Sequence, residues 1–269
     1  MTTATVSKCR PPSPTCYAFK VPPSFAAAYR WDGFSVLNAA NNHAWDYGSP
    51  GVLQTSAALR AAGIVEAGLP GQIGIVQANG VRVAFVDFAP YYNTNDMLDL
   101  ASATQLIATA RREASVVVVY MHAGAEGPQA DHVTRATETF YGEDRGNPYA
   151  FAHAAVDAGA DLVIASGPHV LRGLQWYRGR LIDYSLGDFA NYYDFATVST
   201  LRLSAILRVT LDGSGHFVAG RFISLTLTPS GQPLPDPTGS AAAFVNGLSR
   251  QDFGPTAALV GAGGIIERP

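Results

Sequence analysis

Side chains that can bind metals or transfer protons follow three apolar runs of the sequence, each of a kind typical of a β-strand. They are Asn42, His43 and Asp46 after the run at 34–40, His122 and Glu126 after 115–120, and Ser166 and His169 after 161–165. Imidazole, amide and carboxylate groups suit borderline metals such as Zn, Mn or Fe, and histidine also acts as an acid or base near neutral pH. These residue types therefore permit metal-assisted or acid–base chemistry.

A fourth polar stretch, IDYSLGDF, places Ser185 and Asp188 after a further strand. In α/β proteins ligands bind at the carboxyl ends of the strands, so polar clusters at several strand ends are expected to meet in one pocket. Each histidine taken alone is more typical of a structural role in a loop or beside a buried strand. Their joint occurrence at strand ends favours a shared site, whereas His132, His153 and His216 lack this context.

The overall composition narrows the classes of function. The 269 residues are 48% hydrophobic and 14% charged, with a net charge of −3 and a pI near 6.0. These values are typical of a folded globular protein, and without a basic run they argue against nucleic acid as a partner. A G-x-S-x-G motif and a glycine-rich phosphate loop are both missing from the sequence, which disfavours the chemistry that depends on them.

Residues 1–16 form an irregular N-terminal segment without the apolar run of a secretory signal. Cys9 and Cys16 bracket a proline-rich turn, CRPPSPTC, that can hold them at disulfide distance. A zinc knuckle is disfavoured because the chain has no second cysteine pair, and two unrelated reduced cysteines are the alternative. A disulfide predicts that the protein works outside the reducing cytoplasm.

Hydrophobic periodicity predicts a mixed α/β chain that forms one domain over residues 1–269. Hairpins are expected to turn at Asn79-Gly80, at Arg178-Gly179 and at residues 212–215. The charged stretch YGEDRGN at 141–147 is expected to be solvated. Strands are expected at 34–40, 115–121 and 161–166, and helices at 55–62, 101–113, 149–157 and 241–248.

Several stretches match a known family when they are taken together. They are FSVLNAANNHAWDYGSPGVLQT, VRVAFVDF, VVVYMHAGAE, AVDAGADLVIASGPHVLRGLQWYRGRLIDYSLGDF and VNGLSRQDFG. From about Cys9 onward the chain resembles the bacterial capsule-synthesis protein CapA family, also called the poly-γ-glutamate synthesis or PgsA-type family, within the calcineurin-like metallophosphoesterases. The resemblance implies an α/β fold of four layers, an αββα sandwich of the metallo-dependent phosphatase type.

The resemblance also implies roles for individual residues. Asn42 and His122 correspond to metal ligands, and His169 corresponds to the last histidine of the C-terminal motif, with a metal-binding or catalytic role. His43 corresponds to the group that protonates a leaving oxygen. Asp46 and Glu126 are expected to orient a histidine or to contact the substrate. The expected substrate-binding residues are Ser166, Ser185 and Asp188.

The sequence departs from the family pattern at several places. Family members begin with a strand that ends in Gly-Asp, followed by a stretch like Asn-Leu-Glu, and this chain opens beyond both. Ser166 and Gly167 stand where a second histidine often occurs, and Asp188 stands where the family usually has Asn. We therefore expect a truncated fold without the first strand and an incomplete site for a divalent metal such as Mn, Fe or Zn.

The resemblance predicts a CapA-like protein of the cell envelope that acts in capsule or poly-γ-glutamate synthesis. Its expected substrate is an anionic or peptide-like polymer, and its expected partners are membrane-bound capsule-synthesis proteins. Two alternatives use the same fold. One is a metal-independent acid–base enzyme, such as a peptide epimerase, and the other is a non-catalytic subunit of a polymer-synthesis complex.

Overall fold

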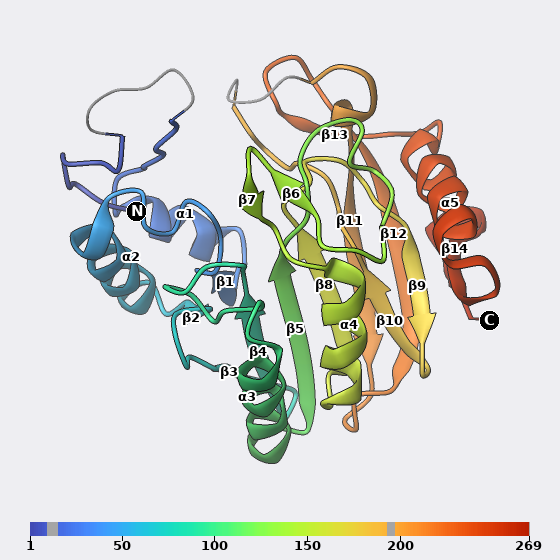
Figure 1. Ribbon diagram of the computed structural model, residues 1–269, viewed down its shortest axis with the longest axis horizontal. Helices are drawn as coiled ribbons and strands as arrows, with labels where there is room; N and C mark the ends of the chain where they lie inside the picture. Colours follow the sequence, from blue (N-terminus) through green and yellow to red (C-terminus); the bar gives the residue numbers. More distant parts are fainter. Residues whose placement is uncertain (10–15, 193–196, 269) are drawn as a thin grey trace.

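An eight-stranded mixed sheet forms the centre of the part of the chain that the computed structural model describes, residues 1–9, 16–192 and 197–268 (Figure 1). Strands β4, β5, β8 and β10 run parallel, so their carboxyl ends meet at one edge, and antiparallel strands extend the sheet on both sides. The strands in order are β15 (Ile266–Glu267), β14 (Ala257–Val260), β9 (Leu174–Tyr177), β10 (Arg180–Asp183), β8 (Leu162–Ser166), β5 (Val116–His122), β4 (Val81–Phe88) and β3 (Gly74–Ala78).

Helices α3 (Leu100–Glu113) and α4 (Pro148–Asp157) cover one face of this sheet (Figure 1). Each helix begins at a residue whose side chain accepts a hydrogen bond from a backbone N–H of the first turn, Asp99 in α3 and Asn147 in α4. The apolar sides of both helices pack on β4, β5 and β8, with Phe151 among the buried side chains. This packing fixes the central strands, whose ends carry the polar clusters.

A smaller sheet packs on the opposite face of the large one. Phe222 and Trp176 lie in the apolar core between the two sheets. The elements of this side are β11 (Leu203–Leu211), β12 (Phe217–Leu227), β13 (Pro233–Pro235) and helix α5 (Ser240–Phe253), which packs along β12 and β14. The expected α/β class, with two sheets back to back and helices outside, is confirmed (Figure 1).

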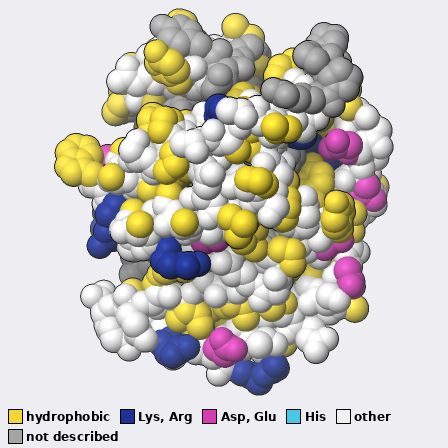
Figure 2. Space-filling view, turned by 90° about the vertical axis from the view of Figure 1, so that its left-hand side faces the viewer, with side chains coloured by type: hydrophobic (Ala, Val, Ile, Leu, Met, Phe, Trp, Pro, Cys, Tyr) yellow, Lys and Arg dark blue, Asp and Glu magenta, His cyan; other side chains and the backbone are white. Residues whose placement is uncertain are grey.

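The part of the chain that precedes β3 forms a separate lobe beside β3 and β4 (Figure 1). Its two short strands pair in parallel. Trp31 is 87% exposed and Leu53 is 66% exposed. Hydrophobic side chains are scattered over this side of the molecule (Figure 2). The elements of the lobe are α1 (Phe25–Trp31), β1 (Val36–Asn38), α2 (Gly48–Ala61) and β2 (Val65–Ala67).

The remaining elements are short. They are β6 (Thr139–Phe140), β7 (Glu143–Asp144) and the 3₁₀ turns η1 (Ser199–Arg202), η2 (Gly254–Thr256) and η3 (Ala262–Gly264). Within the described part of the chain, none of the helices has the length and apolar character needed to cross a lipid bilayer.

Most expected elements are found, and the differences have local causes. The hairpin at Asn79-Gly80 is confirmed, and both residues have the positive φ that a tight turn between two strands requires, 51° and 82°. The expected helix at 55–62 begins earlier, at Gly48, because glycine and proline in its first turns hide the helical pattern. The expected strand at 34–40 has only three residues, and α1 was not expected.

A buried ion pair joins the loop after β5 to the loop after β8. Arg172 and Glu138 are almost fully buried, and two guanidinium nitrogens donate to the two carboxylate oxygens over 3.1 and 2.7 Å. Arg172 also donates from Nε to the carbonyl of Ala130, and Glu138 accepts from the N–H of Ala125. One ion pair therefore fixes both loops.

We expect Arg172→Met to lower the free energy of unfolding by about 3–5 kcal/mol, because it leaves the Glu138 carboxylate buried without its counter-ion. The double variant Arg172→Met/Glu138→Met removes both charges and should lose less stability than the single variant. Urea unfolding followed by circular dichroism measures both. A loss below about 1 kcal/mol in the single variant would contradict the assigned role.

Candidate functional site

The ends of β5 and β8 place His122 and Ser166 side by side. The two residues are partners in the parallel register, and the Ser166 hydroxyl lies 3.3 Å from Nδ1 of His122. The same hydroxyl is hydrogen-bonded to the phenol of Tyr120. Gly167 then turns the chain with φ at 121°, where a Cβ would come within 3.0 Å of the Ala123 nitrogen. Glycine is therefore required here to bring the two strand-end loops together.

His169 has an unusual backbone conformation and two acidic neighbours. Its φ of 61° lies in the left-handed region, which a non-glycine residue adopts at a cost and which often marks a functional position. Its Nδ1 lies 2.6 Å from the Asp188 carboxylate, and its Nε2 lies 3.6 Å from that of Glu126. Burial would lower the pKa of His169, but the hydrogen bond to Asp188 and the charges of both carboxylates raise it.

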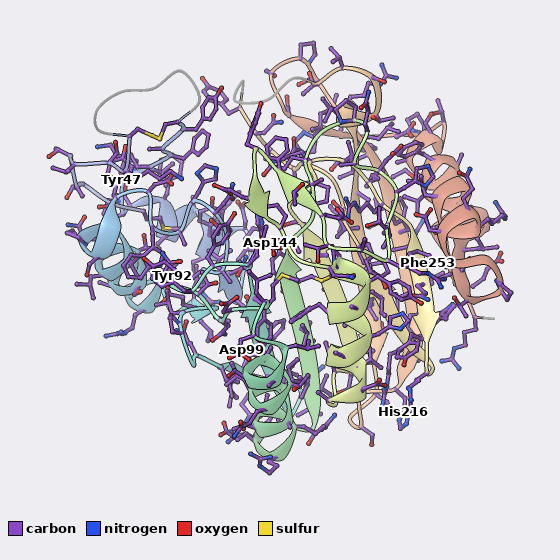
Figure 3. The ribbon with its side chains drawn as sticks, viewed as in Figure 1. Tyr47, Tyr92, Asp99, Asp144, His216 and Phe253 are labelled. Atoms are coloured by element: carbon purple, nitrogen blue, oxygen red, sulfur yellow. A yellow bond between two sulfur atoms is a disulfide. The ribbon has the colours of Figure 1, made fainter. Side chains whose placement is uncertain are left out.

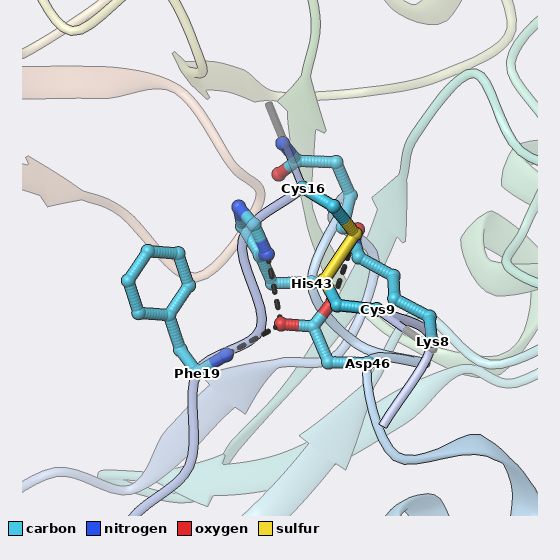
Figure 4. Close-up of a disulfide and its surroundings, with 7 residues drawn as sticks. Lys8, Cys9, Cys16, Phe19, His43 and Asp46 are labelled. Carbon is cyan, nitrogen blue, oxygen red and sulfur yellow. Dashed lines mark hydrogen bonds and ion pairs between the residues drawn. A yellow bond between two sulfur atoms is a disulfide. The ribbon is translucent and has the colours of Figure 1, made fainter. Parts of the chain in front are cut away.

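His43 is paired with Asp46 in the loop after β1 (Figure 4). The distance from its Nδ1 to the Asp46 carboxylate is 2.9 Å, and its backbone N–H donates to the side chain of Asn41. Asp46 is only 1% exposed. Burial would raise its pKa, but hydrogen bonds from His43, Lys8 and the N–H of Phe19 together hold the pKa below its usual value. The ionised carboxylate is thus suited to orient the imidazole.

Arg145 joins these residues from the stretch that was expected to be solvated. That expectation is wrong for this residue: its side chain is 1% exposed, although Tyr141 and Glu143 of the same stretch are exposed. One terminal nitrogen lies 2.7 Å from the carboxylate of Glu126. The other terminal nitrogen and Nε are buried without a hydrogen-bond partner among the described residues. Two donors of a buried cation are therefore free to bind an acceptor.

The pKa of His122 reflects the charges of several of these residues. Burial and, to a smaller extent, the charges of Arg145, His169 and His43 together lower the pKa of His122 to about 3. Charges act in this way only over short distances in a protein interior. The folded protein therefore favours the neutral imidazole of His122.

A metal fits this set of residues only in part. Nε2 of His122 is buried and has no hydrogen-bond partner in the described structure, as a ligand atom would be before it binds a metal. Across the described ranges, however, no three side chains of His, Cys, Asp or Glu are grouped closely enough to hold an ion. The residues present therefore do not form the metal centre that the family pattern predicts.

Other expected site residues make different contacts. Asn42 accepts a hydrogen bond from Lys8 through its backbone carbonyl. Ser185 is buried, and its hydroxyl accepts from the N–H of Gly187 within its own loop. Asp188 is also buried, and its carboxylate contacts Nδ1 of His169 and accepts a hydrogen bond from the side chain of Asn191. The side chains of Ser185 and Asp188 thus hold groups of the strand-end loops in place.

The remaining histidines lie elsewhere. His132 is paired with Asp252, and His153 packs against the rings of Tyr149 and Tyr177. His216 lies in the hairpin between β11 and β12, at the end of the molecule opposite the carboxyl end of β5 (Figure 3).

Comparison with known proteins gives the family context. Residues 2–193, which include the three histidines and Arg145, match the family described as bacterial capsule synthesis protein PGA_cap. The PGA biosynthesis protein CapA of Bacillus subtilis (strain 168) is 34% identical over 203 residues, covering 68% of this chain and 49% of that protein. The capsule biosynthesis protein CapA of Bacillus anthracis is 33% identical over 174 residues, covering 58% of this chain and 40% of that protein. The chain thus spans about half the length of these relatives, or less.

One solved structure is also similar. The 5'-nucleotidase precursor from Thermus thermophilus aligns over 85% of this chain and 45% of that chain, with 14% identity and a TM-score of 0.45. A similarity at this level supports no statement about activity.

Two buried carboxylates lie in the strands beneath the site. Asp87, in β4, is 2% exposed, and Asp183, in β10, is fully buried and accepts from the N–H groups of Ala165 and Ser185. Burial raises the pKa of each to about 7. Both groups therefore favour the protonated form in the folded protein over a pH range where the unfolded chain is ionised.

The pKa of Asp183 is raised in the folded protein, so its protonated carboxyl group contributes stability that is lost as the pH rises through about 7. Asp183→Asn cannot ionise, so the difference in unfolding free energy between this variant and the wild type should shift in favour of the variant from pH 5 to pH 8, by about 1–4 kcal/mol. Denaturant unfolding at the two pH values measures the shift. Asp157→Asn, at an exposed position, is the control, and an equal difference at both pH values for Asp183→Asn would contradict the assignment.

Proposed function

Because the chain belongs to the bacterial capsule synthesis protein PGA_cap family, we propose that it acts in the synthesis of a capsular polymer of the poly-γ-glutamate kind. The relatives named CapA support this role, and the residues of the site support direct contact between this chain and the polymer. The observation that carries the proposal is the contact of buried Arg145 with Glu126, and of Glu126 with His169, at the carboxyl ends of the strands that also carry His122 and Ser166.

The chemistry that these residues favour is acid–base catalysis. His43 and His169 each direct Nδ1 to a carboxylate, which orients the imidazole for proton exchange, and Nε2 of His169 faces the carboxylate of Glu126 over 3.6 Å. Two such pairs around one substrate allow one imidazole to accept a proton while the other donates one. Neutral His122, whose Nε2 has no hydrogen-bond partner among the described residues, is a hydrogen-bonding group for the reacting centre.

The unpaired donors of Arg145 are evidence for an anionic substrate. Its two unpaired guanidinium donors suit a carboxylate, which takes two parallel hydrogen bonds from arginine. A γ-linked glutamate chain carries one free carboxylate on each residue, so it presents such a group next to every amide bond. Glu126 holds Arg145 from one side and faces His169 from the other, and thereby links anion binding to the acid–base pair.

We place the protein outside the cytoplasm, at the cell envelope, with membrane-bound capsule-synthesis proteins as partners. The disulfide between Cys9 and Cys16 supports an oxidising compartment. For a divalent metal such as Mn, Fe or Zn, which the family pattern predicts, the ligand atom that the described residues offer is the unpartnered Nε2 of His122.

We expect the protein to alter the chain length or the stereochemistry of a γ-linked glutamate oligomer of defined length. His43→Gln or His169→Gln should slow this reaction by about 10²–10⁴-fold, because each variant removes one proton-transfer group. Mass spectrometry of the oligomer measures chain length, and deuterium incorporation from heavy water detects epimerisation. His132→Gln is the matched control, since His132 also directs Nδ1 to a carboxylate, but to that of Asp252 in α5.

The reaction is run with Mn²⁺, Fe²⁺ or Zn²⁺ and separately with a chelator. Turnover in chelator that depends on His43 and His169 supports the acid–base proposal. Turnover that requires added metal would contradict a metal-independent reaction. An oligomer that stays unchanged under all conditions would contradict a catalytic role for this chain.

A further inference from the structure

The disulfide lies beside the loop that carries His43 (Figure 4). Cys9 and Cys16 are bonded with their Cα atoms 5.6 Å apart, and residues 10–15 lie outside the part of the chain that is described. Lys8 directly precedes the first cysteine, and Phe19 follows closely after the second. Both residues contact Asp46, the carboxylate that orients His43.

Lys8 holds the His43 loop through three polar contacts. Its ammonium lies 2.7 Å from Oδ1 of Asp46 and donates to the carbonyl of Asn42 over 3.2 Å. Its backbone N–H donates to the carbonyl of Asp46 over 2.7 Å. Main chain and side chain of one residue therefore fix both the position of the loop and the direction of the carboxylate.

Phe19 holds the same pair from the other end of the disulfide segment. Its backbone N–H donates to Oδ2 of Asp46 over 2.7 Å, the oxygen that also faces Nδ1 of His43. Its ring meets the imidazole edge to face, with centroids 4.6 Å apart. Because Lys8 binds one carboxylate oxygen and Phe19 binds the other, the carboxylate cannot rotate without breaking a contact to one of them.

We propose that the disulfide segment is a positioning device for His43, in which the Cys9–Cys16 bond keeps Lys8 and Phe19 on Asp46. A cross-link between the cysteines restricts the separation that the two flanking residues can reach. Without the cross-link, the contacts of Lys8 and Phe19 with Asp46 must themselves restrict the separation of the two residues, which costs conformational entropy. The consequence for catalysis rests on the proposed function, whereas the consequence for the orientation of His43 does not.

The device makes the site sensitive to reduction. A dithiol supplies two electrons and two protons to the sulfur–sulfur bond, which becomes two thiols, while the dithiol closes to its own disulfide. Lys8 and Phe19 are then joined only through the backbone. An acid–base pair assembled in an oxidising compartment is thereby weakened where disulfides are reduced.

The test is the tautomer of His43, measured by ¹⁵N NMR of histidine-labelled protein at about pH 8. With the disulfide intact, we expect the form protonated at Nδ1, which Asp46 accepts. After reduction with a dithiol, the His43 signals should move toward a mixture of the two tautomers. His132 is the internal control, since its Nδ1 lies 2.7 Å from Asp252 far along the chain, and its signals should not move.

Variants separate the disulfide from effects of the reagent. Cys9→Ser/Cys16→Ser should reproduce the reduced spectrum without dithiol. Lys8→Met should also shift the His43 signals, whereas Lys20→Met should not, because Lys20 contacts Ala4 and the ring of Tyr47 instead of Asp46. His43 signals that stay unchanged after complete reduction, or that move equally in Lys8→Met and Lys20→Met, would overturn the proposal.

Activity provides an independent measurement. If the protein turns over the glutamate oligomer, reduction should lower the rate by up to about 10²-fold through misplacement of His43. A rate that is unchanged while the His43 signals shift would overturn the catalytic consequence alone. A tautomer shift in a protein without turnover would support the positioning device and count against the proposed function.

Discussion

The buried ion pair between Arg172 and Glu138 is the interaction on which the rest of the site depends. It closes the long excursion of the chain between β5 and α4 against the loop that follows β8. Backbone hydrogen bonds join Glu138 to Arg145 and Gly146, and Gly124 to Arg145. Because these bonds place Glu126 and Arg145 beside His169, loss of the ion pair would release the anion-binding side of the site as well as destabilise the fold.

The site repeats one arrangement in different loops. A buried carboxylate accepts from Nδ1 of a histidine, as in Asp46 with His43 and Asp188 with His169, and further polar groups hold the carboxylate itself. His122 differs, since a serine hydroxyl faces its Nδ1 and the charges around it disfavour protonation. The neighbours of each histidine thus match the two tasks that we propose: proton transfer at His43 and His169, and neutral hydrogen bonding at His122.

Sequence patterns locate the strand-end residues because strands of this sheet are strongly apolar and end abruptly in polar residues. This is why the positions of His122, Ser166 and His169 could be predicted, together with the hairpins at Asn79-Gly80 and Arg178-Gly179. Arg145 could not, because a charged residue in a glycine-containing loop reads as solvated until its tertiary partners are known. The same holds for the pairing of Arg172 with Glu138 and for the contacts of Lys8 and Phe19 with Asp46, which join residues remote in sequence.

The central claim is that loops from separate strands form one site for an anionic polymer. The most direct measurement is the ¹⁵N NMR spectrum of the histidine side chains during titration with a γ-linked glutamate oligomer. All six histidines are observed at once, so the protein supplies its own controls. We predict that His43, His122 and His169 shift together with one binding constant, while His132, His153 and His216 stay in place. Shifts confined to the second group, or an unchanged spectrum at saturating oligomer, would contradict the account.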